Sequence, residues 1–327
     1  MQESEGFFFF KVIEQPISLV HVQGFQLSAL TYHLQKAIFF GDSKIEPISF
    51  CISDEEISLI APTAVTNTLP KMVDNAPLVF SKASWRAFKL KGTFLPSDCG
   101  VITKFTKFFA LNQIAICCLS CSSSIFVLVP QDQFDLALQM LHTISHFRPE
   151  AVSDQQFPSK NQIKQDFVDY KPPNLSNATV YKLPFRLQIG TLKKSALKNE
   201  MHPLVKLMFF PSNKSRYFMV TITEEEITIV TEPQNLALFS ENDFLDSEIH
   251  KDAVWTPIQL AEEDGFSQCG ILDSFAEPLA KNGVPIFNLS TFHTDIALVK
   301  VEQEKSAIEI LSSIFQLHEE TEELLSK

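Results

Sequence analysis

Apolar runs of strand length alternate along the chain with longer amphipathic stretches. The runs at 85–90, 114–120 and 125–129 predict strands, and a stretch that ends near residue 112 predicts a helix between the first two. After residue 130 apolar residues recur at helical spacing, which predicts a second helix carrying Phe134, Leu138, Leu141 and Ile144. The pattern therefore predicts a βαββαβ-like order that lacks only a clear final strand.

The same pattern returns 170 residues later in the chain. Three anchors recur at this offset, with Trp85, Cys99 and Val129 corresponding to Trp255, Cys269 and Val299. The later copy predicts strands at 254–260, 284–289 and 296–299, a helix after Gly270, and a last helix carrying Ile308, Leu311 and Ile314. We interpret the chain as an internal duplication of two halves.

Each half divides again into two units. A strand at 17–22, a helix at 27–37 and strands at 48–52 and 57–60 are predicted ahead of the pattern described above. A polar, proline-containing stretch between the halves predicts a linker. We therefore expect an α+β fold of four tandem ferredoxin-like βαββαβ units at 1–62, 76–147, 179–232 and 250–318, with the linker at 148–178.

Composition excludes several classes of protein. Of the 327 residues, 45% are hydrophobic and 20% charged, an ordinary globular balance. The apolar runs are too short to cross a bilayer and the start of the chain is acidic, so we expect no membrane contact, no secretion and a cytoplasmic location. A net charge of −12 argues against nucleic acid as a partner, because that binding needs clustered Lys and Arg.

Catalytic and metal motifs are weak in this sequence. Cys118 and Cys121 lie three apart at a predicted buried strand, where they would point to opposite faces, so we expect core cysteines in a reducing compartment. His142 and His146 have a zinc-compatible spacing but no acidic residue between them. We predict no catalytic residue, no metal and no cofactor. An enzyme with a reactive Cys118/Cys121 pair stays a third interpretation.

Two features favour ligand binding. A turn that closes on Gly270 at the start of a helix exposes backbone N–H groups, which attract an anion such as a carboxylate, although a glycine there also serves a simple turn. Asp295 enters an apolar strand where the first half has Ile125. A buried carboxylate is costly without a cation, so Asp295 is either a ligand-facing anion or a solvent-facing turn residue. The acidic residues 54–56 are expected to be turn charges.

These residues resemble the CASTOR or GATS-like family, cytosolic arginine sensors of the TOR pathway built from four tandem ACT domains. The resemblance covers both halves, through 202–211, 265–271 and 290–299, and is most specific in the last unit. It implies that an amino acid lies between the second and fourth units. Carried over by position, the implied ligand-binding residues are Gly265, Cys269, Gly270 and Ile271 at the helix start, Thr291 and Phe292 through their backbone, Asp295 facing a cationic group, and Ile114, Ala115 and Ile116 from the second unit.

The sequence departs from the family at three places. Ala115 stands where the arginine sensors have a serine, and Gln268 replaces an acidic residue, so the ligand is expected to be arginine or another amino acid. Residues 121–125 replace the stretch that engages the GATOR complex in the family, so the expected partner is a GATOR-like regulatory complex or a different one. A homodimer is also expected. The resemblance implies a sensor and not an enzyme; the alternative is a ligand-free ACT-array scaffold that works through protein contacts.

Overall fold

The computed structural model describes most of the chain as strands and helices in regular alternation. The described residues are 8–41, 44–54, 56–73, 76–92, 99–143, 147–150, 179–210, 216–245, 253–261 and 269–319. Within these ranges no helix has both the length and the apolar character needed to cross a bilayer.

The two halves share a common order of elements, except that β1 corresponds to two strands, β11 and β12, and that β4, β5 and β6 have no counterpart strands among the described residues of the second half. The first half contains β1 (Phe8–Val22), α1 (Leu27–Phe40), β2 (Ile48–Ser53), β3 (Ile57–Pro62), α2 (Thr63–Thr66), β4 (Met72–Val73), β5 (Ala76–Pro77), β6 (Val79–Phe80), β7 (Trp85–Gly92), α3 (Thr103–Leu111), β8 (Cys117–Ser120), β9 (Ile125–Pro130), α4 (Phe134–Leu141) and β10 (Phe147–Pro149). The second half contains β11 (Thr179–Lys182), β12 (Leu187–Lys193), α5 (Met201–Phe209), β13 (Tyr217–Ile222), β14 (Glu226–Thr231), α6 (Pro233–Leu236), β15 (Val254–Ala261), α7 (Ile271–Lys281), β16 (Ile286–Ser290), β17 (Asp295–Lys300), α8 (Glu304–Ser312) and β18 (Gln316–Glu319).

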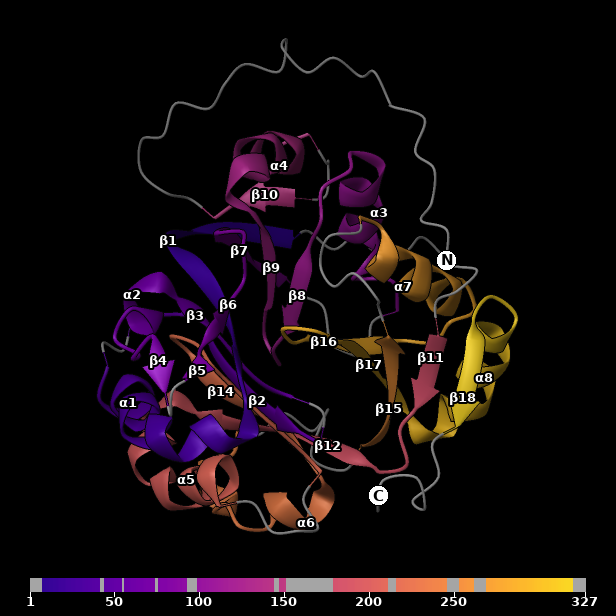
Figure 1. The fold of residues 1–327 in the computed structure, drawn as a ribbon. Helices are drawn as coiled ribbons and strands as arrows, with labels where there is room; N and C mark the ends of the chain where they lie inside the picture. The colour runs from indigo at the N-terminus through magenta and orange to yellow at the C-terminus, as the bar shows by residue number, and fades with distance from the viewer. Residues whose placement is uncertain are drawn as a thin grey trace.

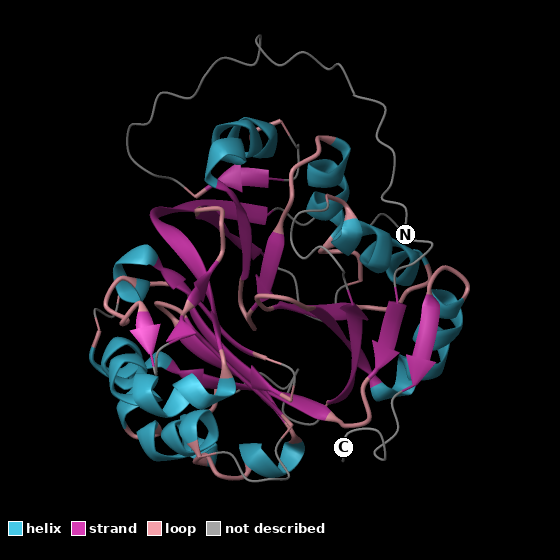
Figure 2. Cartoon of the chain, viewed as in Figure 1, coloured by secondary structure: helices cyan, strands magenta, loops and turns pink. Residues whose placement is uncertain are grey.

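The strands of both halves join one sheet that closes on itself. Its order is β12-β14-β13-β2-β3-β1-β7-β9-β8-β16-β17-β15, and β15 pairs in turn with β12, so the path returns to its start. Figure 1 shows these strands curving around a common interior, and Figure 2 shows the helices on the outside. Because side chains alternate between the faces of a strand, one set must fill the interior and the other must contact the helices.

A single apolar core fills the interior of the closed sheet. It includes both repeated tryptophans, Trp85 at 3% and Trp255 at 0% exposure, together with Leu119 and Leu289. Other members come from β1, β2, β3, β9, β12, β13, β14 and β17. Separate cores on the outer face pack the sheet against α1 and α5, against α3 and α4, and against α7 and α8. The tryptophans recur in the sequence because both copies point into this shared interior.

The two halves meet at two seams in the sheet. At one seam β2 and β13 pair over six residues, with Phe50 opposite Val220. At the other, β8 and β16 pair only at Leu119 and Leu289. Each of these facing pairs joins residues 170 apart, which is the arrangement expected where two copies of one element meet about a two-fold axis.

Strand β1 shows that the expected unit boundaries are wrong at their first strands. Residues 8–13 pair with β7, whereas residues 17–22 pair with β3. In the second half β11 likewise pairs with β15 and β12 with β14. We therefore define unit 1 as residues 17–80, unit 2 as 8–13 and 85–149, unit 3 as 187–245, and unit 4 as 179–182 and 254–319.

Strands β10 and β18 are the final strands of units 2 and 4, and the sequence pattern did not predict them. They pair in parallel with β1 and β11 at the sheet rim, over three and four residues. Such short strands carry too few positions for an alternating pattern. Strand β10 runs to Pro149, so the expected linker cannot begin at 148, and its remainder at 151–178 lies outside the described residues. The last strands of units 1 and 3 shrink further, to β6 and to a single bridge between Leu192 and Phe244.

Several element boundaries also differ from the expected ones. The predicted strand at 114–120 is ordered as a strand only at β8, and α8 ends at Ser312, which leaves Ile314 exposed beyond the helix. Ile144 and His146 lie outside the described residues. Cys118 and Cys121 are free thiols in the outer and inner cores, respectively, as expected for residues on opposite faces.

Lys89 on β7 is a fully buried cation at the junction of units 1, 2 and 3. Its Nζ lies 2.7 Å from Glu46 Oε2 and 2.8 Å from Glu225 Oε2. The backbone N–H of Glu224 also donates to Glu46 Oε2 at 2.9 Å. The side chains of Lys89 and Glu46 are 0% and 3% exposed, so each charge depends on the other for the solvation that water no longer provides.

Replacement of Lys89 by alanine is expected to lower the free energy of unfolding by about 3–5 kcal/mol, because the buried Glu46 would lose its nearer cation. The Lys11 ammonium, 3.5 Å from Glu46 Oε1 and partly exposed, would be left as its ion-pair partner. Lys91→Ala is the matched control. Its ammonium also contacts Glu225, at 2.6 Å, but it is 30% exposed and should cost less than about 1 kcal/mol. Urea unfolding monitored by circular dichroism measures both, and equal losses would contradict the prediction. The double variant Lys89→Met, Glu46→Gln should recover much of the loss.

Candidate functional site

The seam between units 2 and 4 is held by side chains in place of a continuous backbone ladder. The N–H of Cys118 donates to Ser290 Oγ at 3.0 Å, and the N–H of Asn288 donates to Ser120 Oγ at 3.3 Å. The two hydrogen bonds are equivalent at offset 170. Asn288 Nδ2 also donates to Cys118 O at 3.4 Å. The seam is therefore a buried polar strip between two apolar cores.

Asp295 adds a carboxylate to this strip. It begins β17, is 9% exposed, and accepts a hydrogen bond from Ser290 Oγ. Burial raises the pKa of Asp295 to about 6, although the hydrogen bonds from Ser290 and Asn288 oppose the shift. Burial, and then the Asp295 carboxylate, raise the pKa of Cys117 on β8, which places the acid against unit 2. Among the described residues no Lys or Arg pairs with Asp295.

Helix α7 starts at a left-handed glycine. Gly270 has φ +84°, the region that favours glycine, and no side chain of the described residues caps the helix. Within this part of the chain its first N–H groups therefore have no intrahelical or side-chain acceptor. Cys269 and Gly270 are half-buried and Ile271 is buried. Gly265 and Gln268 lie outside the described residues.

Helix α7 packs beside α3 of unit 2 across the seam. Thr106 Oγ1 donates to Asp273 Oδ1 at 2.8 Å in a buried contact, and Lys107 Nζ lies 2.7 Å from Glu277 Oε1 at the surface. Burial raises the pKa of Asp273, and the Thr106 hydrogen bond opposes the shift. This pair fixes the start of α7 relative to unit 2.

Ile114, Ala115 and Ile116 connect α3 to β8 beside the same helix. Ile114 is 1% and Ala115 7% exposed, and Ile116 is half-buried. Ile114 and Ile116 pack in one core with Leu272 and Ala276 of α7. Unit 2 therefore contributes an apolar wall next to the start of α7.

Thr291 and Phe292 lie elsewhere, in the β16–β17 turn, which contacts unit 1. Thr291 Oγ1 donates to Glu56 Oε1, and Phe292 packs against the interior core with its ring 5.8 Å from His21. A cavity of about 30 Å³ beside Thr291 has room for a water molecule but not for an amino acid. The structure thus brings Asp295 to the seam between units 2 and 4. Thr291 and Phe292, in the turn just before it, contact unit 1.

The stretch expected to engage a partner is also used inside the molecule. In the turn at 121–124, Cys121 and Ser124 are buried, and the N–H groups of Ser122 and Ser123 donate to Thr228 Oγ1 at 3.3 Å and Glu226 Oε1 at 3.0 Å. Burial raises the pKa of Cys121, and burial raises that of Cys118 well above the usual thiol value. These thiols therefore lack the accessible thiolate that a reactive pair needs.

Glu56, Ser290 and Asn288 were missed by sequence reasoning. Glu56 was expected to be a turn charge but is 6% exposed, and burial raises its pKa against the hydrogen bond from Thr291. A signal did exist, because a glutamate recurs at offset 170 as Glu226. The two preceding acidic residues recur as well, as residues 224 and 225, so the pattern alone did not single out Glu56. Nothing in the local sequence indicated which element Glu56 contacts.

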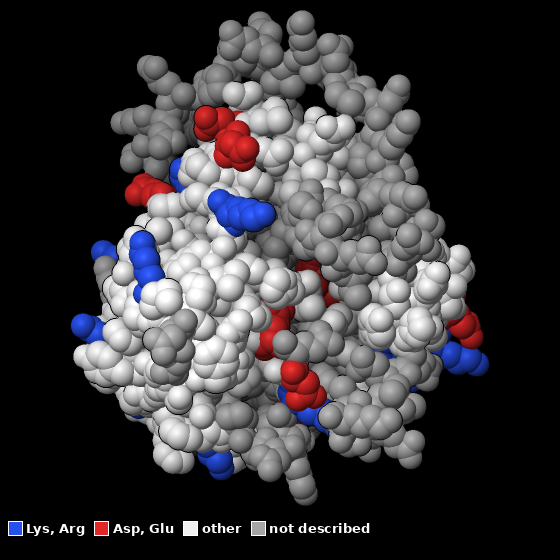
Figure 3. All heavy atoms as spheres, viewed as in Figure 1, with Lys and Arg blue, Asp and Glu red and all other residues white. Residues whose placement is uncertain are grey.

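Surface charge and a second cavity complete the description of candidate sites. On the face shown in Figure 3 the basic side chains stand apart, and acidic side chains gather in the hollow near the centre. A cavity of about 300 Å³ lies in unit 3 between β12 and α6, lined by Thr191, Leu236 and Phe244 among others. None of the residues predicted to bind a ligand lines this cavity.

Comparison with known proteins finds similarity to ACT domains and to arginine sensors. A model of the ACT domain matches residues 80–143 and 252–313, and a model of the N-terminal domain of cytosolic arginine sensor for mTORC1 subunit 1 matches residues 186–242. The rat protein of that name is 28% identical over 143 residues, which are 42% of this chain and 42% of the relative. The human protein is 26% identical over 144 residues, 42% of this chain and 43% of the relative.

The matched part therefore spans less than half of the length of these relatives. Aspartate kinase from Synechocystis is similar in structure at a TM-score of 0.35 and 13% identity, covering 94% of this chain and 55% of the kinase, a likeness too weak to support a statement about this protein. The ACT-domain matches fall on units 2 and 4, whose strands and helices have the α+β order of that domain. Over these residues the chain is similar to ACT-domain proteins and to the cytosolic arginine sensors for mTORC1, the CASTOR family.

Proposed function

We propose that this protein is a cytosolic, non-enzymatic amino-acid sensor in TOR-pathway nutrient signalling, built from four tandem ACT-type units and binding its ligand between units 2 and 4. The names of its relatives support the pathway and the ligand class. The single observation that carries the site is Asp295, a buried carboxylate at the unit 2–unit 4 seam without a cationic partner among the described residues. A regulatory complex of the GATOR kind and a second copy of the chain are its proposed partners.

Asp295 supplies recognition of a cationic amino acid. Its carboxylate loses water in the seam and is compensated only by hydroxyl and amide donors, so it favours the protonated form until about pH 6. A guanidinium or ammonium group beside it would restore the interaction that burial removed. The buried carboxylate thus destabilises the free protein, and a bound cationic ligand would offset that destabilisation.

The start of α7 supplies the complementary half of the site. Its uncapped N–H groups and the helix dipole attract an α-carboxylate. The wall at Ile114 and Ala115 belongs to unit 2, so a ligand here touches both halves. By its higher affinity for the closed seam it would shift the population toward that arrangement, which is the physical basis of sensing.

A ligand-free scaffold is the second candidate function. The packing of Phe292 into the interior core and the hydrogen bond from Thr291 to Glu56 favour it, because both residues already have partners within the chain. The two candidates differ in a simple way. A scaffold requires no ligand at Asp295, whereas a sensor does.

Replacement of Asp295 by asparagine is expected to stabilise the ligand-free protein by about 1–3 kcal/mol at pH 8. The folded-state pKa of about 6 lies above the ordinary 3.8, so wild type loses stability as pH rises through this window and the variant does not. The two proteins should be equally stable near pH 4. Thermal unfolding at several pH values measures this. Asp135→Asn on the exposed side of α4 removes the same charge and should show no such dependence.

Calorimetric titration with arginine, lysine and the neutral amino acids tests the ligand. We expect a basic amino acid to bind wild type and Asp295→Asn to bind it at least about tenfold more weakly, the loss of one charge-assisted hydrogen bond. Affinity should fall by up to about tenfold per pH unit below pH 6, because the ligand binds the ionised carboxylate. The variant should lose this pH dependence. No binding by any amino acid would leave the scaffold as the function, and binding indifferent to Asp295 would overturn the proposed site.

Ala115→Ser restores the hydroxyl that the arginine sensors have at this position. We expect it to strengthen arginine binding by about 1–3 kcal/mol, provided that Ala115 borders the ligand. Ala110→Ser is a matched control, since Ala110 is a buried alanine of α3 that no predicted contact places at the ligand. An affinity unchanged by Ala115→Ser would remove unit 2 from the site while leaving the role of Asp295 open to its own test.

A further inference from the structure

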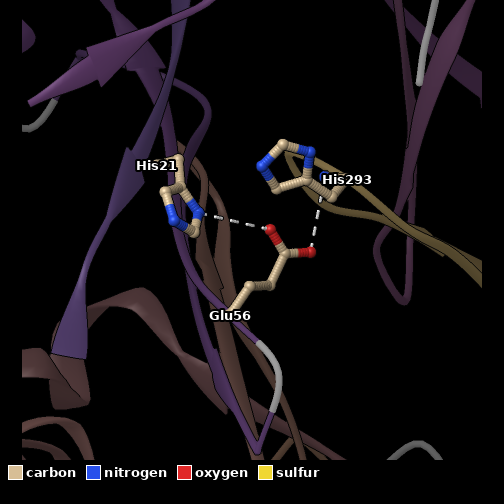
Figure 4. Close-up of side chains that lie close together, drawn as sticks. All are labelled: His21, Glu56 and His293. Carbon is tan, nitrogen blue, oxygen red and sulfur yellow. Dashed lines mark hydrogen bonds and ion pairs between the residues drawn. The ribbon is translucent and has the colours of Figure 1, made fainter. Parts of the chain in front are cut away.

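Two histidines and a glutamate converge where unit 4 meets unit 1. His21 lies on β1, Glu56 precedes β3, and His293 lies in the β16–β17 turn; Figure 4 shows the three side chains turned toward one another. Their ligating atoms all lie within 4.8 Å of one another. Nδ1 of His21 is 3.9 Å from Glu56 Oε2, and the two imidazole rings are 4.9 Å apart.

The two carboxylate oxygens of Glu56 differ in their hydrogen bonding. Glu56 Oε1 accepts hydrogen bonds from Thr291 Oγ1, from Thr294 Oγ1 at 3.2 Å and from the N–H of His293 at 3.4 Å. Glu56 Oε2 and His21 Nδ1 are buried and have no hydrogen-bond partner within the described part of the chain. The Glu56 side chain is only 3% exposed, so this oxygen points at the histidines without compensation for its lost water.

The duplicated half shows what the scaffold itself requires at this junction. At offset 170, Glu226 corresponds to Glu56, Thr191 to His21 and Ser123 to His293. There the N–H of Ser123 donates to Glu226 Oε1 at 3.0 Å, as His293 does to Glu56, and Ser122 Oγ shares a hydrogen bond with Thr191 Oγ1. A glutamate and hydroxyl groups are therefore enough to join the halves. The histidine pair is an addition confined to one junction.

We propose that His21, Glu56 and His293 bind a divalent zinc ion that ties the β16–β17 turn of unit 4 to unit 1. Two imidazole nitrogens and one carboxylate oxygen are a ligand set that zinc accepts, with a fourth position left for water. Ligands held about 2.0–2.1 Å from zinc lie about 3.4 Å apart, so the ligating atoms must approach one another by up to about 1.4 Å. His293 is the exposed member of the three.

The surroundings already suit such an ion. The hydrogen bonds from Thr291 and Thr294 hold the Glu56 carboxylate in place, as hydrogen bonds to metal-binding side chains commonly do. Burial, and then the nearby His293, lower the pKa of His21, so its imidazole is neutral at physiological pH and offers a lone pair. A bound cation would also relieve the buried Glu56 charge.

The test is a zinc titration of the full chain after treatment with a chelator, against a competing fluorescent chelator, with Co²⁺ as the spectroscopic probe. Wild type is expected to bind one equivalent and to show the visible absorption of tetrahedral Co²⁺ with nitrogen and oxygen ligands. His21→Thr and His293→Ser should each weaken zinc binding at least about tenfold. Both substitutes are the residues that the other junction carries, so the scaffold accepts them.

Two further variants make the result decisive. Glu56→Gln keeps the shape of the side chain and should also weaken binding, whereas His202→Ser, an exposed histidine on α5, should bind zinc as wild type does. Zinc should raise the unfolding temperature of wild type and His202→Ser but not of His293→Ser. The proposal is overturned if wild type binds no stoichiometric zinc, or if His21→Thr and His293→Ser retain full affinity.

Discussion

Closure of the sheet is the constraint on which the rest of the structure depends. Since β12 pairs with β15, the interior is enclosed on every side and must be filled by side chains from all four units. Trp85 and Trp255 contribute the largest side chains of that core, one from each half. Neither half can leave the other without exposing this core to water, which ties the assembly of the units to the hydrophobic effect. Ligands can therefore alter how the units sit in the ring but not whether they assemble.

The two seams of the closed sheet differ in how much backbone pairing joins the halves. Units 1 and 3 share a six-residue ladder, whereas units 2 and 4 share one backbone pair and several side-chain hydrogen bonds. A seam with few backbone hydrogen bonds needs less free energy to open. Asp295 lies at this weaker seam. Its charge state therefore affects the stability of the seam that needs less free energy to open. The buried Lys89 cluster, in contrast, fastens the junction of units 1, 2 and 3.

Sequence patterns predicted the parts of this molecule that depend on local chemistry. The offset between Trp85 and Trp255 and the turn glycine before α7 could be recognised from residue type and spacing alone. The position of Asp295 at the start of an apolar strand was also visible, but it left open whether the side chain is buried or faces solvent. The strand exchange through β1 could not, because one continuous apolar strand gives no sign that its two ends join different units. The partners of Glu56 were equally hidden, since the Thr291 hydroxyl lies 235 positions away in the chain.

The first strands of the two halves differ in how they join their units. Strand β1 continues from unit 2 into unit 1 through a register shift between Ile13 and Ile17, whereas its counterpart is divided into β11 and β12 by the segment that contains Pro184. A proline lacks a ladder donor, but β1 contains Pro16 and does not end there, so Pro184 alone does not account for the division. Units 1 and 2 therefore share one strand, whereas units 3 and 4 are joined in the sheet by the two residue pairs between β12 and β15. The covalent path through the first half is also a sheet path, and the second half replaces it with a short non-covalent contact.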